Sequence, residues 1–286
     1  MQHGPAVRRR KLGAELRALR TGAGLTSGEA ARMAGWHQSK VSRIETGSSG
    51  AKPADVRLLL DVYGVADGQL RELLLVLAGT DEGSGRHHWW HAYRGVLPPT
   101  YRDFISLESQ ASAMRTLETS VVPGLLQTPQ YARAVTRAAV EGLDDERLDA
   151  LVEVRLARQD VLRADPPLEL SAVLDEAVLR REVGGPGIMA QQLERLVEAA
   201  RLPQVRLQVL PFSAGAHVGV TGPFVIFSFS RTSDLDVVVL DHLTSSLYLE
   251  RKEDLQAYTE AFNALQIHAL SPEDSLDFIA GLGDGA

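Results

Sequence analysis

The sequence contains no cysteine among its 286 residues, and only 4 lysines stand beside 26 arginines. The lack of cysteine excludes disulfides, cysteine-ligated zinc, iron–sulfur clusters and thiol-based redox sensing. No apolar run reaches the roughly 18 residues that a spanning helix needs, and no apolar signal-peptide core follows the basic N-terminus. These absences predict a cytoplasmic protein with no membrane partner. The arginine bias hints at a GC-rich genome rather than at a mechanism.

Charge is distributed unevenly along the chain. Residues 1–80 hold 12 Lys and Arg against 7 Asp and Glu, whereas residues 81–286 hold 18 against 30. Apolar residues make up 44% and charged residues 23%, which is typical of a globular protein with room for two domains. A basic N-terminal part followed by an acidic remainder favours a polyanion-binding module joined to a domain with another role.

The basic part of the chain shows a series of short helices. Leucines at helical spacing predict a first helix that ends at Gly22. Thr26 and Glu29 then form the pattern of a capping box at the start of a second helix, near 27–34. Gly35 supplies a turn before a third helix, and two further apolar stripes predict a fourth and a fifth.

The third helix is polar on one side, and Val41 and Ile44 lie on the other. Two short helices, a glycine turn and a polar face on the second helix are typical of a helix-turn-helix. The DNA major groove admits one α-helix and displays base edges, so double-stranded DNA is the expected partner. The alternative is a solvated polar helix of a small bundle. We predict an all-α, five-helix helix-turn-helix domain at 8–79 and a linker at 80–86.

The stretch LTSGEAARMAGWHQSKVSRIETG resembles the helix-turn-helix of the Cro and lambda-repressor-like family, also called the xenobiotic-response-element type. The resemblance covers about residues 11–79. It implies base contacts from Gln38, Ser39 and Arg43. Phosphate contacts are expected from five side chains, three by the resemblance and two from the polar face of the third helix: Ser27, Thr46 and Lys52, then Lys40 and Ser42.

The same resemblance implies a buried ion pair between Arg20 and Glu45, which links the first and third helices. Two positions depart from the family pattern. Ser27 stands where the family often has Gln, so that phosphate clamp is shorter. Ala30 stands where Leu is frequent, which predicts a lighter core at that position.

The acidic remainder, residues 87–280, combines helices with later strands. A helix is expected near 100–119, and helical signals return near 186–201 and 251–268. Strands are expected at five segments: 168–174, 204–210, 223–229, 236–241 and 245–250. Helices first and a strand meander later indicate an α+β domain with a mainly antiparallel sheet.

This part also resembles a known family. PGLLQT, LDEAVLRR, the LPF-x-x-GAH-x-G-x-x-GPF run and ALSPEDS resemble the large uncharacterised domain that follows such helix-turn-helices in streptomycete-type actinobacterial regulators. The resemblance covers about residues 89–280. It implies no established chemistry, although a small protein partner is expected by analogy.

Two stretches invite a metal or phosphate interpretation. In RHHWWHAY, His87 and His91 are four residues apart and would share one face of a helix. No third ligand is evident, so aromatic packing beside exposed histidines is favoured. The glycine-rich HVGVTGPF (217–224) lacks the Lys-Ser/Thr ending of a phosphate loop, so it predicts a strand-to-strand loop. No metal and no cofactor are expected.

Acid–base residues also occur together, without the surroundings that catalysis requires. Glu176 and Arg180 are spaced as a surface helix pair, which is a simpler interpretation than acid–base work by Asp175 and Glu176. Asp241 and His242 precede two serines, but no nucleophile-elbow sequence accompanies them. We therefore do not expect an enzyme. The alternative is an enzyme or metal-responsive domain that the helix-turn-helix targets to DNA.

The sequence thus predicts a nucleoid-associated transcriptional regulator that binds a two-fold operator as a homodimer. The C-terminal domain is expected to dimerise, to sense a small molecule or a small protein, or to do both; an antitoxin-like protein pair is a further alternative. One hypothesis places five residues around an effector pocket or interdomain face: Trp89, Trp90, Tyr93, Gln127 and Tyr131. Ordinary core packing is the competing interpretation of those residues.

Overall fold

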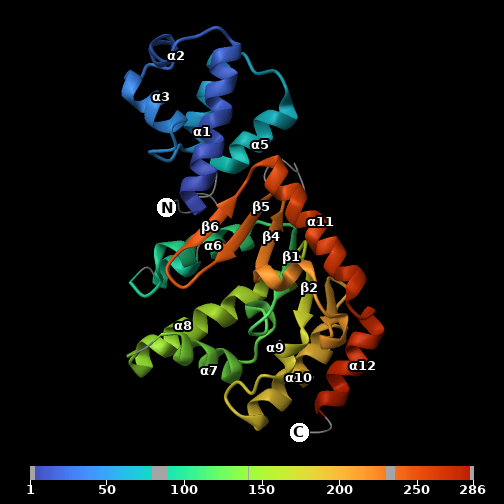
Figure 1. The fold of residues 1–286 in the computed structure, drawn as a ribbon. Helices are drawn as coiled ribbons and strands as arrows, with labels where there is room; N and C mark the ends of the chain where they lie inside the picture. The colour runs from blue at the N-terminus through green and yellow to red at the C-terminus, as the bar shows by residue number, and fades with distance from the viewer. Residues whose placement is uncertain (1–3, 79–88, 94, 141, 230–235, 284–286) are drawn as a thin grey trace. The chain divides into compact units, whose positions relative to one another are not determined.

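The computed structural model describes residues 4–78, 89–93, 95–140, 142–229 and 236–283 (Figure 1). The chain divides into two compact units, Met1–Trp89 and Trp90–Ala286. The expected linker at 80–86 lies outside the described residues. Each unit is described by itself below.

The N-terminal unit consists of helices, as the sequence predicts. They are α1 (Gly4–Gly22), α2 (Ser27–Met33), α3 (Gln38–Glu45), α4 (Pro53–Val62) and α5 (Gly68–Ala78). Each helix contributes fully buried side chains to one core, among them Leu16, Ala30, Ile44, Leu59 and Leu74. The short helices gain their stability from this shared core, because isolated helices of such length are marginal in water.

Local signals fix where α2 begins. The Thr26 hydroxyl accepts a hydrogen bond from the backbone N–H of Glu29 at 3.2 Å, and the Glu29 carboxylate accepts one from the backbone N–H of Thr26 at 2.8 Å. The capping box expected from the sequence is therefore confirmed. Gly35 has a φ of 69°, a backbone conformation that favours glycine, and it makes the turn between α2 and α3.

The C-terminal unit has many helices around one sheet. The helices from its start are η1 (Trp89–Tyr93), α6 (Pro99–Glu108), η2 (Gly124–Leu126), α7 (Pro129–Ala139), α8 (Asp145–Ala157), η3 (Arg158–Arg163), α9 (Glu176–Arg180), α10 (Pro186–Ala199), η4 (Phe212–Ala214), η5 (Val218–Thr221), α11 (Lys252–His268) and α12 (Pro272–Gly283). The strands are β1 (Ala113–Glu118), β2 (Glu169–Asp175), β3 (Val205–Leu210), β4 (Phe224–Ser228), β5 (Val237–Asp241) and β6 (Ser246–Leu249).

The six strands form one mixed sheet in the order β3-β2-β1-β4-β5-β6. β1, β2 and β3 pair in parallel, whereas β1–β4, β4–β5 and β5–β6 pair antiparallel. Antiparallel pairings are thus in the majority, and the expected α+β class is confirmed. The expected meander is limited to β4, β5 and β6; helical crossovers join the parallel strands.

One expected helix is wrong in its second half. The helix predicted near 100–119 ends at Glu108, and residues 113–118 form β1, a central strand. Met114 of β1 lies opposite Leu170 of β2 and Phe227 of β4. Pairing on both edges gives the backbone of this segment hydrogen-bond partners that a helix would have supplied internally.

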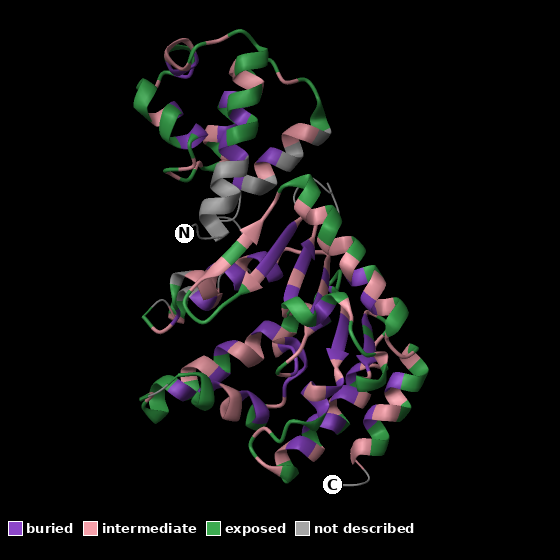
Figure 2. Cartoon of the chain, viewed as in Figure 1, coloured by how far each residue is buried: buried purple, intermediate pink, exposed green. Residues whose placement is uncertain are grey.

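The two faces of the sheet pack into separate cores. Met114 lies in the core covered by α10 and α12, whereas Leu117 lies in the core covered by α11. Phe262 of α11 and Ile279 of α12 are both almost fully buried. Figure 2 shows that buried positions make up much of the strands of the sheet, whereas the helices around it alternate between buried and exposed positions. The C-terminal helix α12, which the sequence interpretation omits, therefore completes one of the two cores.

Candidate nucleic-acid interface

The polar residues of α3 share one exposed face. Gln38, Ser39, Ser42 and Arg43 are exposed, and Thr46 continues the face at the C-cap. At 3.6 residues per turn these five positions span only about 140° of the helix. Val41, Ile44 and Glu45 are buried and lie outside this sector. The helix thus offers a continuous polar surface while packing fixes its other sides.

Gln38 is held in place from the preceding helix. Its side-chain Nε2 donates to the hydroxyl of Ser27 at 3.0 Å, which joins the first residue of α3 to the first residue of α2. Because the Ser27 oxygen acts as acceptor here, its own O–H remains a donor. Arg43 is exposed, and among the described residues its guanidinium makes no hydrogen bond, so its donors are available to a ligand.

Lys40 is less available than the sequence interpretation assumes. Its ammonium forms an ion pair with Asp55 of α4 at 2.8 Å and lies 3.6 Å from the centroid of the Trp36 ring. Lys40 therefore sits at the flank of α3, already balanced by a carboxylate and a ring face. Ser42, by contrast, lies in the middle of the exposed polar face.

Two further phosphate-contacting candidates lie beyond α3. The Thr46 hydroxyl donates to the carbonyl oxygen of Ser42 at 2.9 Å, and it lies 2.8 Å from the hydroxyl of Ser48. Lys52 is exposed and is the N-cap of α4, where its backbone N–H donates to Asp55 at 3.4 Å. Thr46 thus has a structural role at the end of α3, and Lys52 is an exposed residue at the start of α4.

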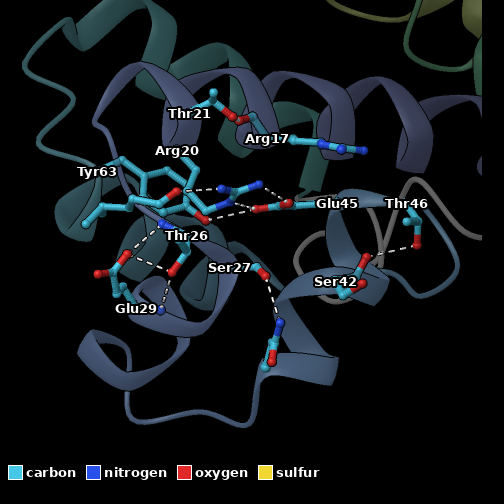
Figure 3. A network of polar contacts seen from close by, with 12 residues as sticks. Arg17, Arg20, Thr21, Thr26, Ser27, Glu29, Ser42, Glu45, Thr46 and Tyr63 are labelled. Carbon is cyan, nitrogen blue, oxygen red and sulfur yellow. Dashed lines mark hydrogen bonds and ion pairs between the residues drawn. The ribbon is translucent and has the colours of Figure 1, made fainter.

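Arg20 and Glu45 form the ion pair that the resemblance implies (Figure 3). Arg20 Nε and Nη2 donate to the two carboxylate oxygens of Glu45 at 2.7 and 3.0 Å, and Nη1 donates to the carbonyl of Leu25 at 2.6 Å. The hydrogen bonds to Glu45 raise the pKa of Arg20. One arginine thereby ties α1, the turn before α2, and α3 together.

Tyr63 and Gly13 complete this support and were not identified from the sequence. The Tyr63 hydroxyl lies 3.5 Å from Glu45, and burial raises the pKa of that hydroxyl. A Cβ built on Gly13 would lie 2.4 Å from the carbonyl oxygen of Ile44. The backbones of α1 and α3 therefore approach so closely that only glycine fits. A glycine inside an otherwise leucine-rich helix was the available signal for this contact.

The aromatic cluster after the linker divides between surface and core. Trp90 is buried, whereas Trp89 and Tyr93 are partly exposed. A hydrogen bond to Glu153 contributes, after burial, to a raised pKa of Tyr93. His87 lies outside the described residues. Among the residues that the structure describes, no group of three metal-ligating side chains is found.

Gln127 and Tyr131 belong to the core of the C-terminal unit. Tyr131 is fully buried, and its hydroxyl accepts from the backbone N–H of Val122 at 3.1 Å. Gln127 is also buried; it donates to the carbonyl of Val122 at 2.7 Å and accepts from Arg155 at 3.0 Å. The two side chains therefore order the turn before α7 and present no surface to a ligand.

The carboxylates at the end of β2 serve the fold. Asp175 accepts from the backbone N–H of Ala177 at 2.8 Å and so caps α9. Glu176 accepts from the backbone N–H of Phe212 at 2.7 Å and pairs with Arg180 at 2.5 Å. The two carboxylates thus hold the start of α9 and the loop from β3 to β4 in place. The strand-to-strand loop expected at 217–224 is confirmed.

The remaining acid–base candidates lie in a tight turn. Asp241 ends β5, Ser246 begins β6, and the N–H of His242 donates to the carbonyl of Ser245 at 2.9 Å. A hairpin turn explains the sequence of this segment. Over the described ranges of the chain, no helix is long and apolar enough to cross a membrane.

The fold and the exposed face of α3 define a class, a helix-turn-helix protein with the architecture of a DNA-binding regulator. Residues 11–74 match the model of a helix-turn-helix domain, and residues 101–281 match the model of the domain of unknown function DUF5753. The second match covers more than half of the chain, so this chain belongs to the DUF5753 family. No curated protein and no solved structure matches the sequence.

Proposed function

We propose that this chain is a sequence-specific transcriptional regulator of the cytoplasm and nucleoid that binds a two-fold DNA operator as a homodimer. The observation that carries the proposal is the exposed polar face of α3, whose other sides are held by the core and by the Arg20–Glu45 pair. The helix-turn-helix match and the basic balance of residues 1–80 support it. The proposed role is binding, not catalysis.

Gln38 and Arg43 are proposed to read bases, with Ser39 beside them. Ser27 uses one amide N–H of Gln38, which leaves the amide oxygen and the second N–H to pair with adenine. The fork of Arg43 matches the two acceptors on the major-groove edge of guanine. Both assignments require α3 to enter the groove by its N-terminal end.

Phosphate contacts are proposed to surround this reading face. The Ser27 O–H remains a donor at the start of α2, where the helix N-terminus also attracts anions. Lys52 adds an exposed charge near the start of α4. Ser42 and Thr46 offer hydroxyls, and Lys40 contributes only to the extent that a phosphate displaces Asp55.

The C-terminal unit is proposed to supply the dimer contact and to respond to an effector, either a small molecule or a small protein partner. A single recognition helix touches few base pairs, and two-fold dimers gain specificity by reading two half-sites. The unit holds a core on each face of its sheet, which supports its role as a folded domain that carries such contacts.

Selection from a randomised duplex library tests this function. The full chain should enrich a motif with two related half-sites, separated by about one helical turn. The same chain with Gln38→Ala and Arg43→Ala should enrich no motif while it keeps salt-sensitive binding to any duplex. The proposal fails if the unaltered chain enriches nothing above the starting library.

A further inference from the structure

The C-terminal unit contains a cavity of about 420 Å³ between the segment before α6 and the helices α7 and α8. Much of its wall is apolar and includes Val96, Pro98, Leu143 and Leu151. Such a volume lies within the range of small-molecule sites. Neither Gln127 nor Tyr131 lines it; Arg155 and Tyr101 do.

Arg155 brings to this cavity a positive charge that no carboxylate of the described residues contacts directly. Its Nη1 donates to Gln127 at 3.0 Å, but over the described residues Nε and Nη2 make no hydrogen bond and no ion pair. Burial lowers the pKa of Arg155, although the nearby charges of Glu118 and Glu108 oppose the effect. Because Nε and Nη2 of Arg155 have no hydrogen-bond partner among the residues described, an anion that reaches these two nitrogens would be stabilised by the guanidinium.

The neighbouring Arg158 shows how the same unit treats an arginine with a structural role. Its Nε and Nη2 donate to both carboxylate oxygens of Glu108 at 2.8 and 2.6 Å, and its Nη1 donates to the hydroxyl of Tyr101 at 2.6 Å. Arg158 and Glu108 are both buried. Each of the three guanidinium nitrogens of Arg158 thus has a partner within the protein, whereas only Nη1 of Arg155 does.

Tyr101 provides a second donor on the cavity wall. Its oxygen accepts from Arg158, so its own proton must point elsewhere. Within the described part of the chain that proton meets no acceptor. The arginine polarises the hydroxyl and strengthens it as a donor. Two independent donors, from Arg155 and Tyr101, thus face one largely apolar cavity.

We propose that this cavity binds a small organic carboxylate, with its carboxylate on Arg155 and Tyr101 and its apolar body against Val96, Pro98, Leu143 and Leu151. Asp144 and Arg147 also line the cavity and offset each other in charge, so Arg155 leaves a net single positive charge, which matches a monoanion better than a phosphate dianion. That this ligand acts as an effector rests on the proposed regulatory function; the binding site itself does not.

Calorimetric titration of the full chain, without DNA, tests the site. The probes are benzoate, phenylbutyrate and octanoate, each beside its primary amide, with inorganic phosphate as a further probe. At least one acid should bind about tenfold or more tightly than its amide, because only the acid gains charge-assisted hydrogen bonds. Equal binding of acids and amides, binding of phosphate alone, or no binding across the panel overturns the proposal.

Variants locate the site. Arg155→Met should remove the preference for the acid, and the exposed Arg163→Met is the matched control that should keep it. Ala139→Trp adds bulk from the exposed end of α7, which lines the cavity, and should weaken acid and amide together. This variant keeps the test decisive if Arg155→Met does not fold. Unchanged binding in Arg155→Met or Ala139→Trp overturns the proposal.

Operator binding is measured separately. If the acid binds and operator affinity changes with it, the effector role is supported. If the acid binds and operator affinity stays constant, the effector role alone is overturned. If the chain binds no operator at all, the regulatory function fails while the carboxylate site stands on its own titration.

Discussion

At the scale of single residues, Asp55 should limit the charge that α3 offers to DNA in the proposed complex. It pairs with Lys40 at 2.8 Å, so the Lys40 ammonium is partly neutralised before DNA arrives. Asp55→Asn should release Lys40 and raise affinity for any duplex. Each added phosphate contact steepens the plot of log K against log salt by about 0.9.

The control for this prediction is Asp61→Asn, which removes the same charge from α4 but leaves Lys40 paired, since Asp61 pairs with Arg71. Fluorescence anisotropy at several salt concentrations measures both slopes. Equal slopes in the two variants would show that the Lys40–Asp55 pair does not limit phosphate contact. The pair also explains why Lys40→Ala should cost less than an unpaired lysine would.

Glu45 is the residue whose loss should most destabilise the N-terminal unit. Its side chain is only 5% exposed and balances Arg20, which is 11% exposed. Glu45→Ala leaves a buried guanidinium uncompensated and should cost about 3–5 kcal/mol of unfolding free energy. Calorimetric melting of the full chain should show an earlier transition for this unit.

Asp61→Ala is the comparison, because it breaks the ion pair with Arg71 at a position where Asp61 is 64% exposed. Exposed pairs contribute at most about 1 kcal/mol. Similar melting of the two variants would contradict the structural role assigned to Glu45.

Glu118, at the end of β1, should make stability depend on pH. Burial raises the pKa of Glu118 to about 7, and the charge of Asp241 adds to the effect, while Thr116, Arg158 and Arg155 oppose it. The folded chain therefore binds a proton that the unfolded chain, with a pKa of 4.5, releases. This contribution to stability is present below 4.5 and is lost as pH rises through about 7.

Glu118→Gln keeps the neutral form at every pH. It should stabilise the chain by about 1–3 kcal/mol near pH 8 and by almost nothing near pH 4. Glu118 is partly exposed, which favours the lower part of that range. Urea unfolding at both pH values, with the exposed Glu194→Gln as control, measures the difference. A pH-independent effect would contradict the assignment to Glu118.

At the scale of elements, two glycines of α1 predict opposite outcomes. A Cβ on Gly13 would lie 2.4 Å from the Ile44 carbonyl oxygen, whereas a Cβ on Gly22 meets nothing within 4 Å. Gly13→Ala should destabilise by about 1–3 kcal/mol through overpacking against backbone. Gly22→Ala should be neutral or stabilise by up to about 1 kcal/mol, because alanine favours the helix. Melting temperatures that shift in the same direction would contradict the close approach of α1 and α3.

The elements of the N-terminal unit were predictable because their signals are local. Thr26, Glu29 and Gly35 act within a few residues of their own positions, and the family resemblance added the distant Arg20–Glu45 pair. β1 was not predictable in the same way. Ala111 and Ala113 continue the helical spacing of α6, and only pairing with β2 and β4 makes the segment a strand.

Contacts between elements limited the site prediction as well. The spacing of α3 identified its polar face but could not show that Asp55, from the next helix, neutralises Lys40. The cavity beside Arg155 could not be predicted from the sequence for a similar reason. Its walls come from segments spread over residues 96–155, and no local pattern marks them.

At the scale of the whole molecule, the regulator is expected to be a homodimer. Sedimentation at micromolar concentration should give twice the 31.1 kDa of one chain, both free and on operator DNA. A stable interface requires roughly 1,200 Å² of buried surface, which the larger C-terminal unit is best placed to provide. A monomer under both conditions would contradict the dimer.

The central claim is that α3 reads DNA bases, and binding-site selection with the full chain and its Arg43→Ala variant tests it most directly. The account predicts that Arg43→Ala loses the preference for one base, a guanine, in each half-site and keeps the others, at a cost of about 1–3 kcal/mol. Lys40→Ala should weaken all sequences alike. Identical motifs from the unaltered chain and Arg43→Ala, together with altered preferences in Lys40→Ala, would contradict this account.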